Sequence, residues 1–205
     1  MTAAAAPIRV RAPAVAARWL VAAGLLLALG TIVGLRWWAT RAGLDPLAIG
    51  ALFGLALGSV AVARAGRPTL PGPRSVVIGI AVGLGLALIT LAASSVSGIG
   101  AGTLLGRPAA PFVPWAAITI VVATAEEAIL RGRLFDAIRR AGGLAPAMLV
   151  TTVAFALMHV PLYGWHVVPL DLAVGLALGG LRLATGGIAA PAAAHAVADL
   201  ATWWL

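Results

Sequence analysis

The chain has 205 residues, of which 62% are hydrophobic and only 10% are charged. Soluble domains carry about 25% charged residues, so this composition excludes a water-soluble globular protein and indicates a membrane protein. The net charge of +8 comes from 14 basic residues, all arginine, against 6 acidic residues. Because the arginines stand between apolar runs, we expect membrane lipid as a partner and no nucleic acid. The chain has no cysteine, which excludes disulfides and cysteine-bound metals.

Seven segments are apolar enough to be membrane-crossing helices, each of which needs about 20 such residues. In chain order they are Val15–Leu35, Pro46–Ala63, Ser75–Val96, Pro111–Leu130, Ala145–Leu162, Val168–Leu183 and Ile188–Leu205. The first segment is followed by Arg36, Trp37 and Trp38 instead of a small-residue cleavage site, so it is predicted to be retained. The sequence therefore predicts an all-α, polytopic transmembrane bundle of about seven helices.

The arginines are distributed unevenly between the two predicted sides of the membrane. If the N-terminus is cytoplasmic, three of them fall outside: Arg36, Arg41 and Arg107. Eleven fall inside: Arg9, Arg11, Arg18, Arg64, Arg67, Arg74, Arg131, Arg133, Arg139, Arg140 and Arg182. Basic residues favour the cytoplasmic side, so we expect a multi-pass protein of the cell membrane with a cytoplasmic N-terminus and an outer C-terminus.

The two halves of the chain differ in the polar residues that their predicted helices contain. The three helices of residues 1–110 carry no internal charge and are expected to be a scaffold. Residues 111–205 hold four helices and the candidate catalytic core. Glycines four residues apart predict close helix packing at two places. These pairs are Gly54 with Gly58 and Gly79 with Gly83.

Ionisable residues inside predicted spans are confined to the C-terminal half. They are Glu126, Glu127, His159, His195 and Asp199. Charged groups in a bilayer are unfavourable, and they usually mark a functional site. Residues four apart share a helix face, so His195 and Asp199 project together, and Glu127 can pair with Arg131. Glu126 is rotated by about 100° from Glu127 and is free to face a cavity.

The depth of these residues can be estimated from the predicted turns. Gly142-Gly143 is expected to form the turn of a helical hairpin, with Glu126 16 residues before Gly142 and His159 17 after it. The two residues are therefore level across the hairpin. His195 lies 8 residues past the Gly186-Gly187 turn, or about 12 Å along a helix. We expect all three side chains to meet in a cavity reached from the cytoplasmic side.

Three motifs in this half resemble those of a known family. Glu126-Glu127-Ala-Ile-Leu-Arg131 matches EExxxR, Phe155 to His159 matches FxxxH, and His195 to Asp199 matches HxxxN/D. In this order they resemble the CAAX protease and bacteriocin-processing (CPBP) family of intramembrane endopeptidases. The resemblance covers about residues 111–205. Three motifs in order on three separate helices are much more specific than any one of them.

The resemblance implies a role for each matching residue. Glu126 would be the general base that activates a water molecule, with His159 assisting, and Glu127 and Arg131 would shape the site. The substrate would be a peptide or membrane protein cut near the membrane, close to its C-terminus or a transmembrane segment. CAAX-type and bacteriocin-related processing both fit this description.

The same resemblance implies that His195 and Asp199 stabilise the oxyanion. Asp199 stands where eukaryotic members have asparagine, although aspartate occurs among bacterial relatives. An ionised aspartate cannot donate a hydrogen bond to an oxyanion. Asp199 must therefore be protonated, or it orients His195 instead.

Several alternatives remain open at this stage. Zinc bound by Glu126, His159 and His195 is one, although a mechanism that needs no cofactor is favoured because the chain lacks a His-Glu-x-x-His pair. A proton-coupled transporter would also place carboxylates and histidines in the membrane. A non-catalytic scaffold or immunity protein is a third reading.

Asp171 is expected to be a structural helix cap near Pro169.

Overall fold

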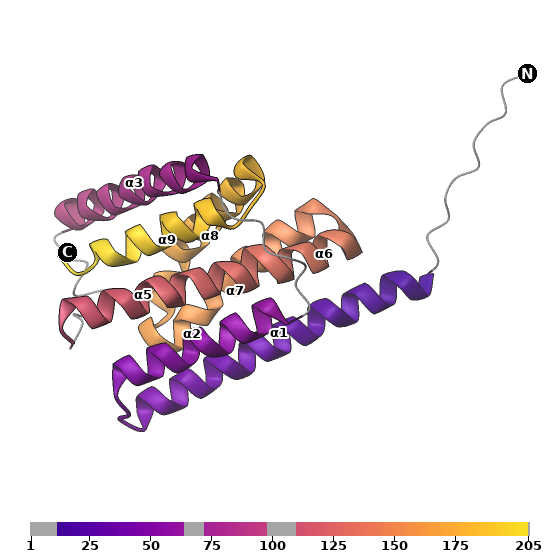
Figure 1. Ribbon diagram of the computed structural model, residues 1–205, viewed down its shortest axis with the longest axis horizontal. Helices are drawn as coiled ribbons and strands as arrows, with labels where there is room; N and C mark the ends of the chain where they lie inside the picture. Colours follow the sequence, from indigo (N-terminus) through magenta and orange to yellow (C-terminus); the bar gives the residue numbers. More distant parts are fainter. Residues whose placement is uncertain (1–11, 64–71, 98–109, 205) are drawn as a thin grey trace, which may run out of the picture.

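The computed structural model describes residues 12–63, 72–97 and 110–204, and every regular element within these ranges is helical (Figure 1). The elements are α1 Ala12–Arg41, α2 Pro46–Val62, α3 Pro73–Ser97, α5 Phe112–Glu127, η1 Ala128–Leu134, α6 Phe135–Gly142, α7 Leu144–Tyr163, η2 Trp165–Val167, α8 Val168–Thr185 and α9 Ala189–Ala201. The all-α prediction is confirmed for this part of the chain. Arg9, Arg11, Arg64, Arg67 and Arg107, on which the predicted orientation partly depends, lie outside the described residues.

Five helical stretches are long and apolar enough to cross a membrane. They are Val15–Arg41, Pro73–Ala92, Phe112–Gly142, Leu144–Tyr163 and Trp165–Thr185. Each of the seven predicted segments contains a helix, but α2 has only 17 residues and α9 only 13. The protein is therefore a multi-pass membrane protein, whereas seven crossings and the orientation stay predictions.

The fourth predicted segment is longer than expected. It was predicted to end at Leu130, but the helix continues through η1 and α6 to Gly142. Arg131 does not mark a membrane edge, because it is fully buried. Arg133 donates hydrogen bonds to the backbone carbonyls of Val60 and Ala63 at the end of α2. Since Arg131 has its partners inside the protein, the span can continue past it.

The two glycine turns lie at one end of the bundle. Gly143 ends α6 with φ of 92° and Gly186 ends α8 with φ of 72°, both in the region that favours glycine. In Figure 1 these turns lie on the right, and the C-terminus and the α1–α2 connection lie on the left. At that left end Asp45 caps α2 by accepting a hydrogen bond from the Ala48 N–H, at 2.7 Å.

Glycines let α3 lie directly against α9. A Cβ atom on Gly79 would come within 2.3 Å of the Ala190 carbonyl oxygen, and one on Gly83 within 2.5 Å of that of Ala194. The predicted role of this glycine pair is confirmed. In α2 the prediction is half wrong, because Gly54 faces α5 whereas a Cβ on Gly58 would meet nothing within 4 Å.

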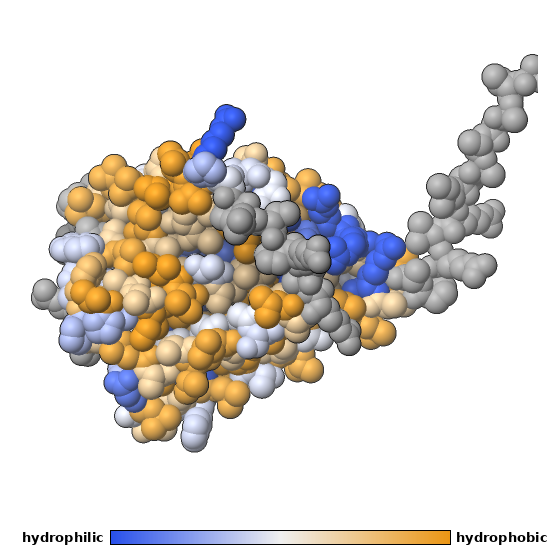
Figure 2. All heavy atoms as spheres, in the orientation of Figure 1, coloured by the Kyte–Doolittle hydropathy of each residue, from blue (hydrophilic) through white to orange (hydrophobic). Residues whose placement is uncertain are grey.

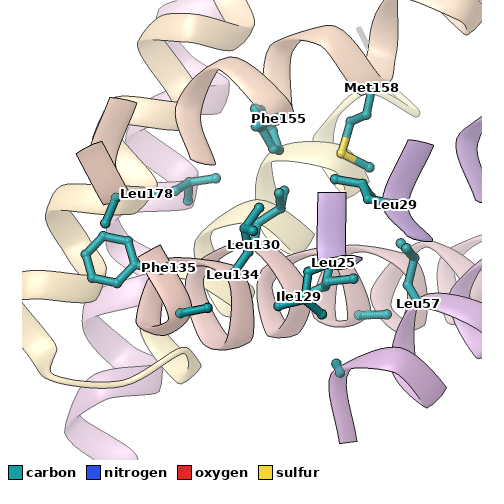
Figure 3. Packing of buried hydrophobic residues seen from close by; sticks show 14 of the residues in the cluster. Leu25, Leu29, Leu57, Ile129, Leu130, Leu134, Phe135, Phe155, Met158 and Leu178 are labelled. Atoms are coloured by element: carbon teal, nitrogen blue, oxygen red, sulfur yellow. The ribbon is translucent and has the colours of Figure 1, made fainter. Parts of the chain in front are cut away.

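One hydrophobic cluster joins the N-terminal and C-terminal helices. Leu25 and Leu29 of α1 and Leu57 of α2 pack with Ile129 and Leu130 of η1 (Figure 3). Apolar side chains cover much of the visible outer face, and hydrophilic atoms gather near α6 (Figure 2). This distribution suits a protein surrounded by lipid. The division into residues 1–110 and 111–205 stays a prediction.

Candidate active site

The acidic pair Glu126 and Glu127 lies halfway along the longest described span, where its two members face different partners. Glu127 Oε1 lies 2.7 Å from Arg131 Nη1, and neither side chain is exposed. Arg131 Nη2 also donates to the Gly175 carbonyl at 3.0 Å, and its guanidinium lies 4.6 Å from the centre of the Phe155 ring. The expected pairing of Glu127 with Arg131 is therefore confirmed, and α8 and α7 hold the arginine in place.

The backbone changes to a π-helix directly after this pair, over Ala128–Leu134. Such turns are rare and occur frequently at functional sites. The Arg131 carbonyl oxygen accepts a hydrogen bond from Arg182 Nε of α8 at 2.9 Å. This contact fixes the segment that carries Arg131, and through it the position of Glu127.

His195 of α9 contacts both glutamates. Its Nδ1 lies 3.1 Å from Glu127 Oε1, and its Nε2 lies 3.8 Å from Glu126 Oε2. Asp199, one turn later, places Oδ2 3.5 Å from the same Nε2. With Nδ1 donating to Glu127, the ring is oriented so that Nε2 faces Glu126.

His159 of α7 approaches Glu126 from the other side. Its Nε2 lies 4.0 Å from Glu126 Oε2, and its Nδ1 lies 2.9 Å from the Phe155 carbonyl oxygen. A proton on Nδ1, donated to that carbonyl, leaves Nε2 as the nitrogen that faces the carboxylate. Three helices thus bring Glu126, His159 and His195 together, as their spacing predicted.

Asp171 has a different environment from the one expected of a helix cap. It is the fourth residue of α8, and its side chain makes no cap hydrogen bond. Instead its Oδ2 lies 3.4 Å from His159 Nδ1. This oxygen is buried and has no hydrogen-bond partner among the described residues. The cap prediction was wrong because Asp171 faces α7.

Arg36 of α1 was missed as a site residue. Its Nη1 lies 3.9 Å from Glu126 Oε1, and its guanidinium lies 4.3 Å from the centre of the Phe53 ring of α2. The sequence placed Arg36 at the outer end of the first span, but α1 continues to Arg41. An arginine inside a helix of 30 residues is the signal that could have identified it.

The more exposed members of the site lie away from the glycine turns. Glu126 is 2% exposed, whereas the side chain of Arg36 is 20% exposed and that of Asp199 is 42% exposed. Arg36 lies near the C-terminal end of α1 and Asp199 near that of α9, at the end on the left in Figure 1. These two side chains therefore lie away from the glycine turns, and access from the cytoplasmic side stays a prediction.

A separate cavity of about 510 Å³ occurs at the opposite end of the bundle. It is lined by Asp136, Arg139, Arg140, Arg182, Leu183 and Gly186. None of these residues belongs to the predicted catalytic set. Arg182 pairs with Asp136 there at 3.4 Å.

The spacing of the side chains can be compared with that of a zinc site. Zinc lies about 2.0–2.2 Å from nitrogen and oxygen ligands, so two ligands of a tetrahedral site lie about 3.4 Å apart. Here the ring nitrogens lie 3.8 and 4.0 Å from Glu126 Oε2. Among the described residues, no three His, Asp or Glu side chains are arranged to hold a metal ion. This arrangement does not fit zinc.

The fold and the site define a helical membrane protein with a buried carboxylate between two histidines. Residues 108–201 match the family model described as Type II CAAX prenyl endopeptidase Rce1-like. The resemblance inferred from the three motifs is confirmed over this region: residues 108–201 are similar to the Rce1-like family, whose members are proteases. No curated protein and no solved structure matches the chain.

Proposed function

We propose that the protein is a membrane-embedded endopeptidase in which Glu126 activates a water molecule. The observation that carries this proposal is the convergence of two imidazole nitrogens on one oxygen of Glu126, at 3.8 and 4.0 Å. These separations are too long for direct hydrogen bonds and suit a bridging water. The family match over residues 108–201 supports peptide-bond hydrolysis as the reaction.

In the proposed reaction, a water held between Glu126 and His159 attacks the scissile carbonyl carbon. Glu126 accepts a proton from this water as the new C–O bond forms. The tetrahedral intermediate then collapses, the C–N bond breaks, and the proton passes to the leaving amine. His159 assists by accepting a hydrogen bond from the water at Nε2.

Glu127 and Arg131 have a positioning role in this proposal. Arg131 holds Glu127, and Glu127 accepts the Nδ1–H of His195. Because both members of the ion pair are fully buried, the pair is rigid and is not available to a substrate. Asp199 contacts His195 Nε2 from the exposed side, which favours an orienting role over donation to an oxyanion.

The substrate is proposed to be a peptide or membrane protein cut close to its C-terminus or a membrane segment. CAAX-type processing is favoured by the family description, and bacteriocin-related processing is a second member of the same reaction class. We propose that the protein lies in the cell membrane with a cytoplasmic N-terminus. The partly exposed side of the site, with Asp199, would then face the outer leaflet.

The test is hydrolysis of quenched fluorescent peptides by the purified protein in detergent, with and without a chelator. The peptide library should include C-terminal CAAX sequences with and without a prenyl group. Cleavage that is lost in Glu126→Gln but survives the chelator would support a metal-free glutamate peptidase. Loss with the chelator and recovery with zinc would instead support a metalloenzyme. Activity that persists in Glu126→Gln would refute the proposed mechanism, and proton-coupled transport would then be the next function to assay.

A further inference from the structure

The N-terminal helices supply one cation to the site, Arg36. It lies in α1, outside the family match over residues 108–201, yet its Nη1 is 3.9 Å from Glu126 Oε1. The Phe53 ring beneath its guanidinium fixes the side chain without using its N–H donors.

The second arginine of the site has a partner for each of its two terminal nitrogens. Arg131 donates to Glu127 at 2.7 Å and to the Gly175 carbonyl at 3.0 Å, and it is completely buried. Arg36 differs, since its closest polar contact within the described part of the chain is longer than a hydrogen bond. Its side chain is also 20% exposed. Arg36 is therefore the arginine of this site whose donors are available to a substrate.

In the hydrolysis proposed above, a negative charge moves from the carboxylate of Glu126 to a substrate oxygen near Arg36. When Glu126 takes a proton from water, the water oxygen bonds to the carbonyl carbon, and the carbonyl electron pair moves onto oxygen. The charge thus leaves the carboxylate and appears on an oxyanion close by. Such an oxyanion needs donors already in place, and Asp199 in its ionised form is not one.

We propose that Arg36 stabilises this oxyanion by donating a hydrogen bond to it. A cation within 4 Å of Glu126 is close to the carbon that the activated water attacks. A substrate's terminal carboxylate would lie about 10 Å away if three residues follow the cleaved bond, so it is the less suitable partner for Arg36. When the intermediate collapses, the electron pair returns to the carbonyl, the C–N bond breaks, and Arg36 again faces the carboxylate of Glu126.

This inference rests on the proposed function and is tested with the best-cleaved member of the peptide library. Arg36→Gln should lower kcat by about 100-fold with little change in KM, the size of effect seen when an oxyanion donor is removed. Arg36→Lys keeps the charge and should retain part of the activity. The matched control is Arg41→Gln, an exposed arginine on the same helix, which should match the unmodified protein.

A binding measurement separates this role from a structural one. A phosphonamidate analogue of the same peptide mimics the tetrahedral intermediate, whereas the corresponding uncleavable amide mimics the substrate. Arg36→Gln should weaken binding of the phosphonamidate by about the factor lost in kcat, and leave binding of the amide unchanged. Equal weakening of both ligands, or an unchanged kcat, would overturn the role of Arg36. If Glu126→Gln stays active, the proposed function itself fails, whatever Arg36→Gln does.

Discussion

His195 Nδ1 lies 3.1 Å from Glu127 Oε1, deep in the bundle and away from any exposed surface. Because the same oxygen of Glu127 accepts Arg131 Nη1 at 2.7 Å, one carboxylate connects the arginine of one motif to the histidine of another. Glu127 and His195 are 68 residues apart in sequence, so this contact is a product of helix packing. It is the reason why we propose different roles for the two adjacent glutamates.

The buried ion pair should contribute to stability as well as to the position of His195. Glu127→Gln leaves Arg131 buried without its counter-charge, and removal of one partner of such a pair costs about 3–5 kcal/mol. We expect a clear loss of thermal stability in detergent together with a loss of activity. Glu126→Gln is the matched comparison and should lose activity while unfolding close to the normal temperature. Equal stability of the two variants would contradict this assignment.

Asp171 is predicted to support His159 electrostatically. Asp171→Asn removes the negative charge 3.4 Å from His159 Nδ1 but leaves the Phe155 carbonyl as a hydrogen-bond partner. We expect kcat to fall by about tenfold, the equivalent of about 1.4 kcal/mol, with KM nearly unchanged. Steady-state kinetics on the best-cleaved peptide would measure this. A loss as large as that of Glu126→Gln would show that Asp171 has a more direct role.

The close packing of α3 on α9 predicts different effects for two glycines of one helix. Gly83→Ala would place a methyl group 2.5 Å from the Ala194 carbonyl oxygen, one residue before His195. We expect destabilisation by about 1–3 kcal/mol and reduced activity. Gly85→Ala meets nothing within 4 Å and is the control, which should be as stable as the unmodified protein or slightly more so. Unfolding curves of both variants in the same detergent would decide the matter.

The predicted orientation can be mapped with single cysteines, because the natural chain has none. Arg139→Cys and Trp204→Cys place thiols at exposed positions at opposite ends of the bundle. With a cytoplasmic N-terminus, an impermeant maleimide should label Trp204→Cys in intact cells and Arg139→Cys only after permeabilisation. The reverse labelling would place the exposed side of the candidate site toward the cytoplasm.

Local spacing in the sequence predicted the helices and the central residues of the site. Apolar runs located a helix in each of the seven predicted segments, because a helix in lipid must satisfy its own backbone and present apolar side chains. They did not predict the continuation of the fourth helix through η1 and α6. The four-residue spacing of Glu127 with Arg131 placed both on one helix face. Equal distances from the Gly142-Gly143 turn brought Glu126 level with His159. These relationships lie within one helix or one hairpin, so they can be derived without a structure.

Tertiary structure decided which other side chains reach the site and from which direction it is exposed. Arg36 contacts Glu126 only because α1 packs against α2 and η1, and Asp171 contacts His159 only because α8 is rotated toward α7. The sequence by itself thus determined a helical membrane protein with a glutamate and two histidines at one depth. The helix neighbours, their rotation about their axes and the exposed side of the site depend on contacts between distant segments. Spacing along the chain does not specify these contacts.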